Sequence, residues 1–345
     1  MPGDAKPLAV YALTPAGARL ARALAAELGA SLYLPRKLAA PGDLAFDSLP
    51  ELVGRAFDAH CGHVFVAACG IVVRAVAPHL RSKTRDPAVV ALDQHGRHAV
   101  SLLSGHLGGA NDLARRVAAF TGGEAVITTA TDTQGLPSLD LLARDSGLAI
   151  EDVRAVRHAN MALLRGEPLQ VFDPHGQLSV PPGHAERFEW VAAPHLLDAE
   201  RPAVLVTWRV LDAPEHHLVL RPRLLVAGVG CRKGAPAPDI VAAVAGACAA
   251  RGAALKSLTA LASIEAKRGE PGLHEAAREL GAELLFYPAG RLAGVGVPNP
   301  STLVHKHMGV HSVCEAAALL AAGTDRLLAP KARTANTTVA LALAG

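Results

Sequence analysis

Aromatic side chains are scarce in this chain of 345 residues, where Phe, Trp and Tyr together make up 3%. Proteins that bind RNA or single-stranded DNA offer aromatic platforms for base stacking beside their basic residues. Here the few aromatics are not interleaved with cations, no run of five like charges occurs, and the formal net charge is only +3. The composition therefore argues against nucleic acid as a partner.

Paired cysteines and long apolar runs are also missing. The five cysteines are odd in number, widely spaced and without any C-x-x-C pair, which argues against a disulfide framework and a zinc ribbon. No stretch reaches the roughly 20 uninterrupted apolar residues of a membrane span. Residues 1–8 lack the apolar core and cleavage site of a signal peptide. We expect a cytoplasmic protein with reduced thiols and no membrane partner.

The chain is rich in apolar residues, which occur in short, regular runs. Half of its residues are apolar, and its length is too great for one comfortable core. Strand-like runs alternate with helical patterns, which predicts an α/β protein with two Rossmann-like domains of parallel or mixed sheets. We expect an N-terminal α/β domain at 1–135, a smaller α+β middle domain at 136–222 and a C-terminal α/β domain at 223–345.

Local signals place several elements of the first domain. Thr14-Pro15 is an N-cap followed by proline at the first helical position, and Gly29 marks the end of that helix. The runs 88–93 and 98–103 flank turn residues, which predicts a hairpin, and 124–129 is a further strand. In the C-terminal domain we expect a strand at 255–261 and a loop at 263–272.

The stretch Ser101 to Asp112 packs a strand end, a glycine-dense turn and a helix start into twelve residues. Its glycines, Gly105, Gly108 and Gly109, match neither G-x-G-x-x-G nor a P-loop, which weakens the case for a nucleotide. Two interpretations stay open. The glycines either expose backbone N–H groups to an anion at a helix start, or they only permit close packing.

Polar side chains crowd this turn although packing alone needs none of them; they are Ser104, His106, Asn111 and Asp112. A second polar segment, Thr128 to Asp132, follows the next predicted strand. The two loops should converge at strand ends, where open α/β sheets bind their ligands. His106 is a candidate general base, proton donor or axial ligand to a metal that a substrate carries.

Charged residues of the C-terminal domain also gather at predicted strand ends and helix starts. They are Cys231-Arg232-Lys233, Glu265, Lys267, Glu270 and Glu315. Such a set suits the binding of an anionic substrate by charge pairing, with acid–base chemistry; a surface ion-pair loop is the alternative. No residues stand at a convincing metal-ligand spacing, so we expect no metal bound by the protein.

Long motifs in both α/β domains resemble those of the cobalt-precorrin-5A hydrolases, a family of the oxygen-independent route to cobalamin. In the N-terminal domain the motifs are 69–74, 83–90, 101–112 and 126–132. In the C-terminal domain they are 228–234, 263–273, 297–301 and 312–318 with Lys331, and they look like a domain that the family shares with a small protein of the aerobic pathway. The resemblance covers nearly the whole chain.

The resemblance implies an enzyme that opens the δ-lactone between the ring A acetate and C20. It then cleaves the carbon–carbon bonds that hold C20, releasing acetaldehyde and leaving cobalt-precorrin-5B. The substrate is a tetrapyrrole fringed with carboxylates that brings its own cobalt, so no cofactor is implied. Transient contacts with neighbouring pathway enzymes are the other expected partners. A corrinoid carrier without catalysis would use the same loops and stays the alternative.

The matched motifs suggest residue roles. His106 would activate water or protonate the leaving oxygen, Ser104 and Asn111 would orient the lactone, and Glu265 and Glu270 would add acid–base groups. The remaining candidates would bind the substrate, and they are Gly70, Arg74, Lys83, Asp86, Gly105, Gly108, Gly109, Thr128, Thr129, Asp132, Cys231, Arg232, Lys267, Ser312, Glu315 and Lys331.

Overall fold

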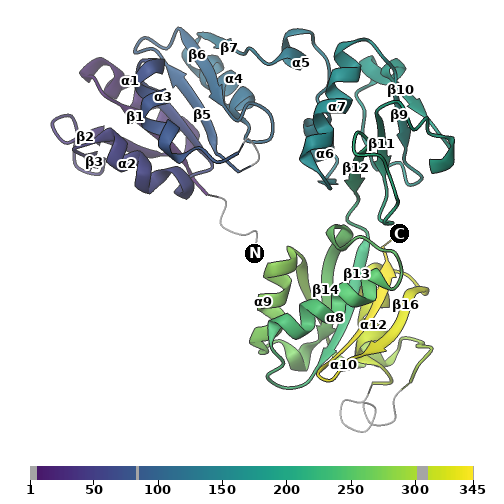
Figure 1. Cartoon of the computed structure of the whole chain (residues 1–345). Coiled ribbons are helices and arrows are strands. Elements are labelled where there is room, and N and C mark those ends of the chain that lie inside the picture. The colour runs from purple at the N-terminus through teal and green to yellow at the C-terminus, as the bar shows by residue number, and fades with distance from the viewer. Residues whose placement is uncertain (1–5, 83–84, 301–309, 345) are drawn as a thin grey trace. The chain divides into compact units, whose positions relative to one another are not determined.

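The computed structural model describes residues 6–82, 85–300 and 310–344, so the candidate Lys83 lies outside the described residues. The chain divides into two units, residues 1–141 with one sheet and residues 142–345 with two sheets. Helices flank each sheet (Figure 1). The predicted α/β class with parallel or mixed sheets is confirmed. Within the described residues, no helix is long and apolar enough to cross a membrane.

The first sheet has seven strands in the order β3-β2-β1-β4-β5-β6-β7. They are β1 (Leu8–Ala12), β2 (Ser31–Pro35), β3 (Leu44–Phe46), β4 (Gly62–Val66), β5 (Ala88–Leu92), β6 (His98–Leu103) and β7 (Glu124–Val126). Strands β1 to β5 are parallel, β6 is antiparallel to β5 as the predicted hairpin requires, and β7 is parallel to β6. The carboxyl ends of β6 and β7 therefore lie at the opposite edge from those of β1, β4 and β5.

Helices cover both faces of this sheet. Helices α1 (Pro15–Leu28) and α4 (Ala110–Thr121) share one apolar core with it, and α2 (Leu49–Ala56) and α3 (Cys69–Val76) share the other. Helix α1 has its predicted bounds, because the Thr14 hydroxyl accepts a hydrogen bond from the Gly17 N–H at 3.1 Å and Gly29 ends the helix at a φ of 61°. Two short helices follow β7, namely α5 (Ala130–Thr133) and α6 (Leu139–Asp145).

Two strands differ from their predicted bounds. Strand β7 stops at Val126, because the Asn111 amide holds Thr129 at 3.1 Å where α5 begins. In the C-terminal domain the chain first makes a 3-10 turn at Leu255–Ser257, and the strand runs from Leu258 to Ile264. Ser263 belongs to that strand rather than to a loop, since its buried hydroxyl donates to the Val229 carbonyl at 2.7 Å.

The second sheet has the order β10-β9-β11-β12-β8. Its elements are β8 (Ala149–Ile150), α7 (Val153–Leu164), β9 (Leu169–Phe172), β10 (Phe188–Trp190), β11 (Ala203–Val206) and β12 (Leu218–Arg221). Four of its strands are parallel and only β8 is antiparallel to its neighbour. Outside the sheets, further 3-10 turns lie at Phe57–Ala59, Ala77–His79, Pro182–Arg187, Pro194–Leu196 and Glu265–Lys267.

The third sheet has the order β15-β14-β13-β17-β16, with β16 and β17 as an antiparallel hairpin beside β13. Its strands are β13 (Leu225–Cys231), β14 (Leu258–Ile264), β15 (Glu283–Tyr287), β16 (Leu327–Arg333) and β17 (Thr337–Leu343). Helices α8 (Ala237–Ala249) and α9 (Pro271–Leu280) pack on one face, and α10 (Ala289–Ala293) and α12 (Val313–Ala322) pack on the other.

Candidate active site

The turn between β6 and α4 is closed by its own backbone. Ser104 has a left-handed φ of 58°, which is uncommon for a residue other than glycine. A Cβ at Gly108 would lie only 2.3 Å from the Ser104 Cβ. The N–H groups of Gly109, Ala110 and Asn111 each donate to a carbonyl of this turn at 2.8 to 3.0 Å. These three donors are satisfied internally, which favours close packing over an anion cradle as the reason for the glycines.

His106 lies between two aspartates. Its Nε2 is 3.0 Å from Asp132 Oδ2, and its Nδ1 is 3.3 Å from Asp140 Oδ2. The hydroxyls of Thr131 and Ser138 also lie near these nitrogens, at 3.3 and 3.1 Å. The three charged side chains are 10 to 14% exposed. The hydrogen bond to Asp140, followed by the contacts with Asp132, raises the pKa of His106 and favours the imidazolium.

Asn111 connects the turn to the second polar segment. Its buried amide accepts from the Ser101 hydroxyl at 2.7 Å and donates to Thr129 Oγ1 at 3.1 Å and to Asp132 Oδ2 at 3.0 Å. Arg115 donates to the other oxygen of Asp132 at 2.5 Å. The two polar loops thus converge as the sequence predicts. The amide of Asn111 is used within the protein, where it positions Asp132.

Other candidates of the N-terminal domain lie beside this cluster. A Cβ at Gly105 would approach Asn111 Oδ1 to 2.8 Å, and a Cβ at Gly108 would lie 3.2 Å from the Asp86 carbonyl oxygen. Thr128 directly precedes Thr129 in the extended connection to α5. The carboxylate of Asp86 accepts the Arg81 N–H at 3.0 and 3.1 Å, so it closes its own loop.

The structure does not bring Gly70 and Arg74 to this cluster. Both belong to α3, which begins directly after β4, and Arg74 Nη1 donates to the Gly70 carbonyl at 2.9 Å. Because β6 runs against β4 and β5, these two residues and His106 lie at opposite edges of the sheet. The predicted hairpin of β5 and β6 already implies this separation, although the motifs alone do not show strand direction.

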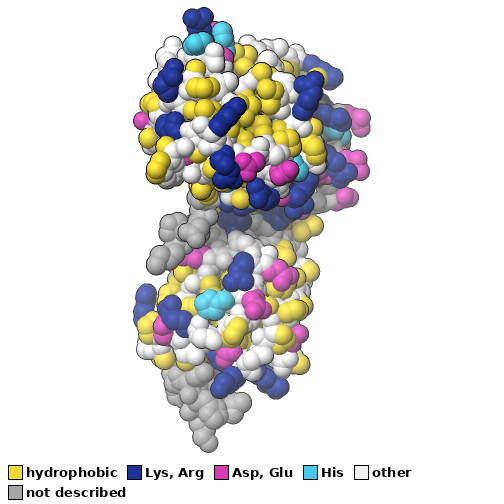
Figure 2. All heavy atoms as spheres, turned by 90° about the vertical axis from the view of Figure 1, so that its left-hand side faces the viewer, with side chains coloured by type: hydrophobic (Ala, Val, Ile, Leu, Met, Phe, Trp, Pro, Cys, Tyr) yellow, Lys and Arg dark blue, Asp and Glu magenta, His cyan; other side chains and the backbone are white. Residues whose placement is uncertain are grey.

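A cavity of about 490 Å³ lies at the edge where α3 begins. Its walls come from the carboxyl ends of β4 and β5, from the segments that follow β1, β4 and β5, and from the first half of β6. Most of its side chains are apolar, including Leu13, Val66 and Leu92. Ile71 also lines it and is 45% exposed. Figure 2 shows hydrophobic side chains gathered among Lys and Arg on one face of the N-terminal unit. Motif reasoning missed this cavity because apolar wall residues carry no chemical signature.

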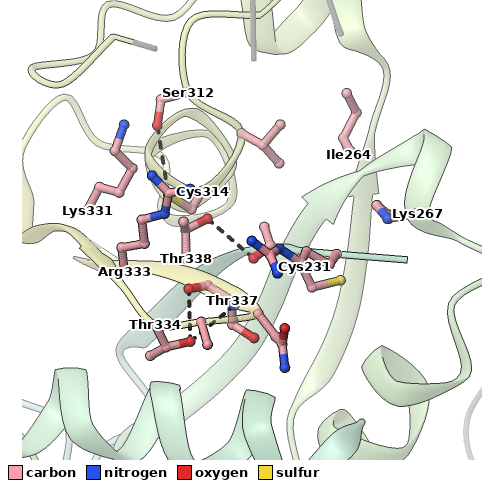
Figure 3. Close-up of a pocket in the computed structure, with 15 residues that line it drawn as sticks. Cys231, Ile264, Lys267, Ser312, Cys314, Lys331, Arg333, Thr334, Thr337 and Thr338 are labelled. Atoms are coloured by element: carbon pink, nitrogen blue, oxygen red, sulfur yellow. Dashed lines mark hydrogen bonds between the residues drawn. The ribbon is translucent and has the colours of Figure 1, made fainter. Parts of the chain in front are cut away.

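A second pocket, of about 300 Å³, opens at the carboxyl end of β13 beside the first turn of α12 (Figure 3). Its side chains include four cations, which are Arg232, Lys267, Lys331 and Arg333. The polar groups that line it are Ser312, Thr334, Asn336, Thr337 and Thr338. None of the described residues that line it is acidic. The predicted residues Cys231, Arg232, Lys267, Ser312 and Lys331 are thus brought together. Sequence reasoning missed Arg333 and the threonines because Lys331 was the one residue of their hairpin that carried the resemblance.

The three glutamates of this domain have different surroundings. Glu315 is fully buried and accepts hydrogen bonds from the Lys331 N–H at 3.0 Å and from the Asn299 N–H and side-chain amide at 3.1 and 2.8 Å. It organises the pocket wall from behind. Glu270 accepts from Lys267 at 3.0 Å. Glu265 is an exposed partner of Arg268 at 2.6 Å, which is the surface ion pair left open from the sequence.

Possible metal ligands are not clustered in the described part of the chain, where no group of three or more His, Cys, Asp or Glu side chains is arranged to hold an ion. The His106 cluster is not a ligand set of this kind. Its imidazole nitrogens face carboxylates across hydrogen bonds, which is an arrangement for holding a proton.

Family models cover most of the chain. A model described as "Cobalamin synthesis G N-terminal" matches residues 51–132, one described as "Cobalamin biosynthesis central region" matches 137–222, and one described as "Cobalamin synthesis G C-terminus" matches 225–342. The His106 turn lies within the first match and the cationic pocket within the third.

Curated relatives agree with these matches. The cobalt-precorrin-5A hydrolase of Salmonella typhimurium is 34% identical over 98% of this chain and 97% of its own length. The enzyme of the same name from Priestia megaterium is 33% identical over 86% of this chain and 82% of its own. Protein CobE of a Sinorhizobium species is 36% identical over 34% of this chain and 79% of its own. The chain therefore belongs to the cobalt-precorrin-5A hydrolase family of cobalamin biosynthesis.

Proposed function

We propose that this chain opens the δ-lactone of cobalt-precorrin-5A and releases acetaldehyde, which leaves cobalt-precorrin-5B. The names of the full-length relatives support the substrate. One structural observation supports the residue that acts, namely the imidazole of His106 between the carboxylates of Asp132 and Asp140. Cobalt belongs to the substrate, and the reaction needs no cofactor bound by the protein.

Opening the lactone requires that a proton reach the leaving oxygen. Water adds to the carbonyl carbon, the ester C–O bond breaks, and the oxygen left on C20 takes up a proton. An imidazolium is suited to donate it. The raised pKa of His106 favours the charged form. To activate water at the start of the reaction, His106 would need a neutral ring, whereas the contacts with Asp140 and Asp132 favour its charged form. We therefore assign His106 as the proton donor rather than as the base that activates water.

Release of acetaldehyde requires that the C20 hydroxyl give up the proton it received when the lactone opened. The freed hydroxyl on C20 loses its proton as its C–O bond becomes double, and the bond between C20 and the macrocycle breaks. The electron pair stays on the macrocycle, which then takes up a proton. The His106 ring is neutral after its first donation, so it can accept the hydroxyl proton and return it to the macrocycle. Asp132, positioned by Asn111 and Arg115, stabilises the ring in its charged form.

The test is an incubation of the purified protein with cobalt-precorrin-5A, with acetaldehyde trapped and the mass of the macrocycle measured. We expect His106→Gln to lower acetaldehyde release by about 100-fold or more, because general acid–base groups contribute about 10²–10⁴-fold. His95→Gln, on the exposed β5–β6 turn, is the matched control and should keep normal release.

Two outcomes would contradict the proposal in different ways. Near-normal release by His106→Gln would remove His106 from the chemistry while leaving the activity in place. Tight binding of the cobalt-corrinoid by the unmodified protein, with no acetaldehyde and no change in macrocycle mass, would identify a carrier.

A further inference from the structure

The pocket of the C-terminal domain has a surplus of positive charge that the chemistry at His106 does not use. Lys267 is partly neutralised by Glu270 at 3.0 Å. The ammonium of Lys331 donates to the neutral carbonyl of Asn299 at 2.7 Å. Arg232 and Arg333 are exposed, and no carboxylate among the residues that the structure describes forms an ion pair with either. Three of the four cations thus keep their charge uncompensated.

A buried hydroxyl in the same pocket also has no partner. Thr337 is 2% exposed, and its Oγ1 makes no hydrogen bond with the described part of the protein. Its backbone polar groups are satisfied, since the Thr337 N–H and carbonyl both form hydrogen bonds with Thr334 at 2.8 to 3.1 Å. Leaving a buried hydroxyl unpaired is unfavourable. A ligand oxygen in the pocket would satisfy it.

The buried carboxylate of Glu315 shapes this pocket without cancelling its charge. Both of its oxygens are occupied, one by the Lys331 N–H and the Asn299 amide group, the other by the Asn299 N–H. Glu315 thereby fixes the strand position of Lys331 while its own charge faces backbone and amide donors. It does not line the pocket.

We propose that this pocket is an anion site that binds a carboxylate-bearing side chain of a tetrapyrrole, held by Lys331, Arg333 and the hydroxyl of Thr337. Its volume of about 300 Å³ is at the low end of small-molecule pockets, which span about 300–1,000 Å³. It therefore accommodates an acetate or propionate group and not the macrocycle. The identity of the anion as a tetrapyrrole carboxylate rests on the proposed function. The positive charge of the pocket and the unpaired Thr337 hydroxyl are observations that hold without that function.

The first test measures binding of uroporphyrin III, an octacarboxylate tetrapyrrole, to the full chain by fluorescence titration. The double variant Lys331→Gln/Arg333→Gln should weaken binding about tenfold or more, as expected for hydrogen bonds to charged groups. The control Arg251→Gln/Arg278→Gln removes the same charge after α8 and in the last turn of α9, outside the pocket, and should leave affinity unchanged. Equal affinity of both double variants would overturn the site.

The second test separates a binding role of Thr337 from a structural one. Thr337→Val keeps the shape and removes the unpaired hydroxyl, so the melting temperature of the free protein should rise. Affinity for uroporphyrin III should nevertheless fall about tenfold. A rise in melting temperature with unchanged affinity would show that the hydroxyl does not meet the ligand and would overturn this contact.

The third test identifies the source of the anion. Hydrogen exchange of peptides that cover 327–343 should slow when uroporphyrin III is added, and citrate should compete only weakly. Protection by citrate or inorganic phosphate without protection by uroporphyrin III would overturn the tetrapyrrole assignment. These experiments contain no lactone and release no acetaldehyde, so their outcome is independent of the hydrolase assay.

Discussion

At His106, each ring nitrogen faces a different carboxylate. A substitution of either aspartate can therefore change the pKa of the imidazole while His106 itself is kept. Burial disfavours the charge on Asp140, but hydrogen bonds from His106 and Ser138 outweigh it and lower the pKa of Asp140. The aspartate is thus ionised in the pH range in which the histidine gains or loses its proton. The pair holds one proton on His106 over a wider pH range than an isolated imidazole would.

Replacing Asp140 tests this coupling. In Asp140→Asn the carboxylate that raises the pKa of His106 most is lost, so the imidazolium should lose its proton at lower pH. If the imidazolium is the active form, the alkaline limb of the pH–rate profile for acetaldehyde release should move to lower pH. Asp145→Asn, at the end of the same helix and paired with Arg144, is the control. An unmoved alkaline limb in Asp140→Asn would contradict the donor role.

At the scale of elements, helix α12 can approach strand β13 only because Gly228 has no side chain. A Cβ there would lie 1.8 Å from the Cys314 carbonyl oxygen and 2.6 Å from the Ala318 nitrogen. Helix α12 is itself built from small residues on this side, with Ala317 and Ala318 fully buried. This close approach brings Ser312 and Cys314 to the pocket wall, so the glycine positions the site through the helix.

Replacing two different glycines by alanine separates the effect of close packing from the effect of glycine on helix stability. Gly228→Ala should lower the free energy of unfolding by about 2 kcal/mol or more, because backbone atoms must shift to admit the methyl group. Gly246→Ala, inside α8 with no atom within 4 Å of the added Cβ, should raise it by about 0.5–1 kcal/mol. Urea unfolding of the two variants measures both. Equal stability of Gly228→Ala and the parent would show that α12 shifts without cost.

For the molecule as a whole, buried histidines contribute to the response of stability to acid. Burial lowers the pKa of His63, in the first unit, to about 4, and burial also lowers the pKa of His217 in the second unit. His63 is fully buried, stacks on Phe57 and Tyr11, and lies 3.0 Å from the Tyr11 hydroxyl. Its neutral form is part of the folded state, whereas the unfolded chain protonates it near pH 6.5.

Stability should therefore fall as the pH drops from about 6.5 to about 4. In this window the unfolded state binds the proton and the folded state does not, and the full span for His63 corresponds to about 3 kcal/mol. Hydrogen exchange of the amides in β4, measured at several pH values, follows this loss. The variant His63→Phe removes the titrating ring and should flatten the dependence, while His95→Asn should not. An equally steep dependence in His63→Phe would assign the acid response to other groups.

Local signals in the sequence were enough for the α/β class, for the bounds of α1 and for the β5–β6 hairpin. They were also enough to bring Asn111 and Asp132 together, since both follow neighbouring strands. They could not pair His106 with Asp140, because that contact forms only when a distant segment folds back. Nor could they include Arg333 and Thr337 in the pocket, since these depend on how the hairpin of β16 and β17 lies beside β13. Contacts between such distant segments are determined by tertiary packing and not by residue type.

The reversal of β6 and β7 against the other five strands also divides the helix macrodipoles of the first sheet. Helices α1 and α3 start at one edge, whereas α4 starts at the other. A fully parallel sheet would collect all these partially positive helix ends at a single edge. Here each edge carries only part of that positive field, so the helix starts of this domain do not add up at one place.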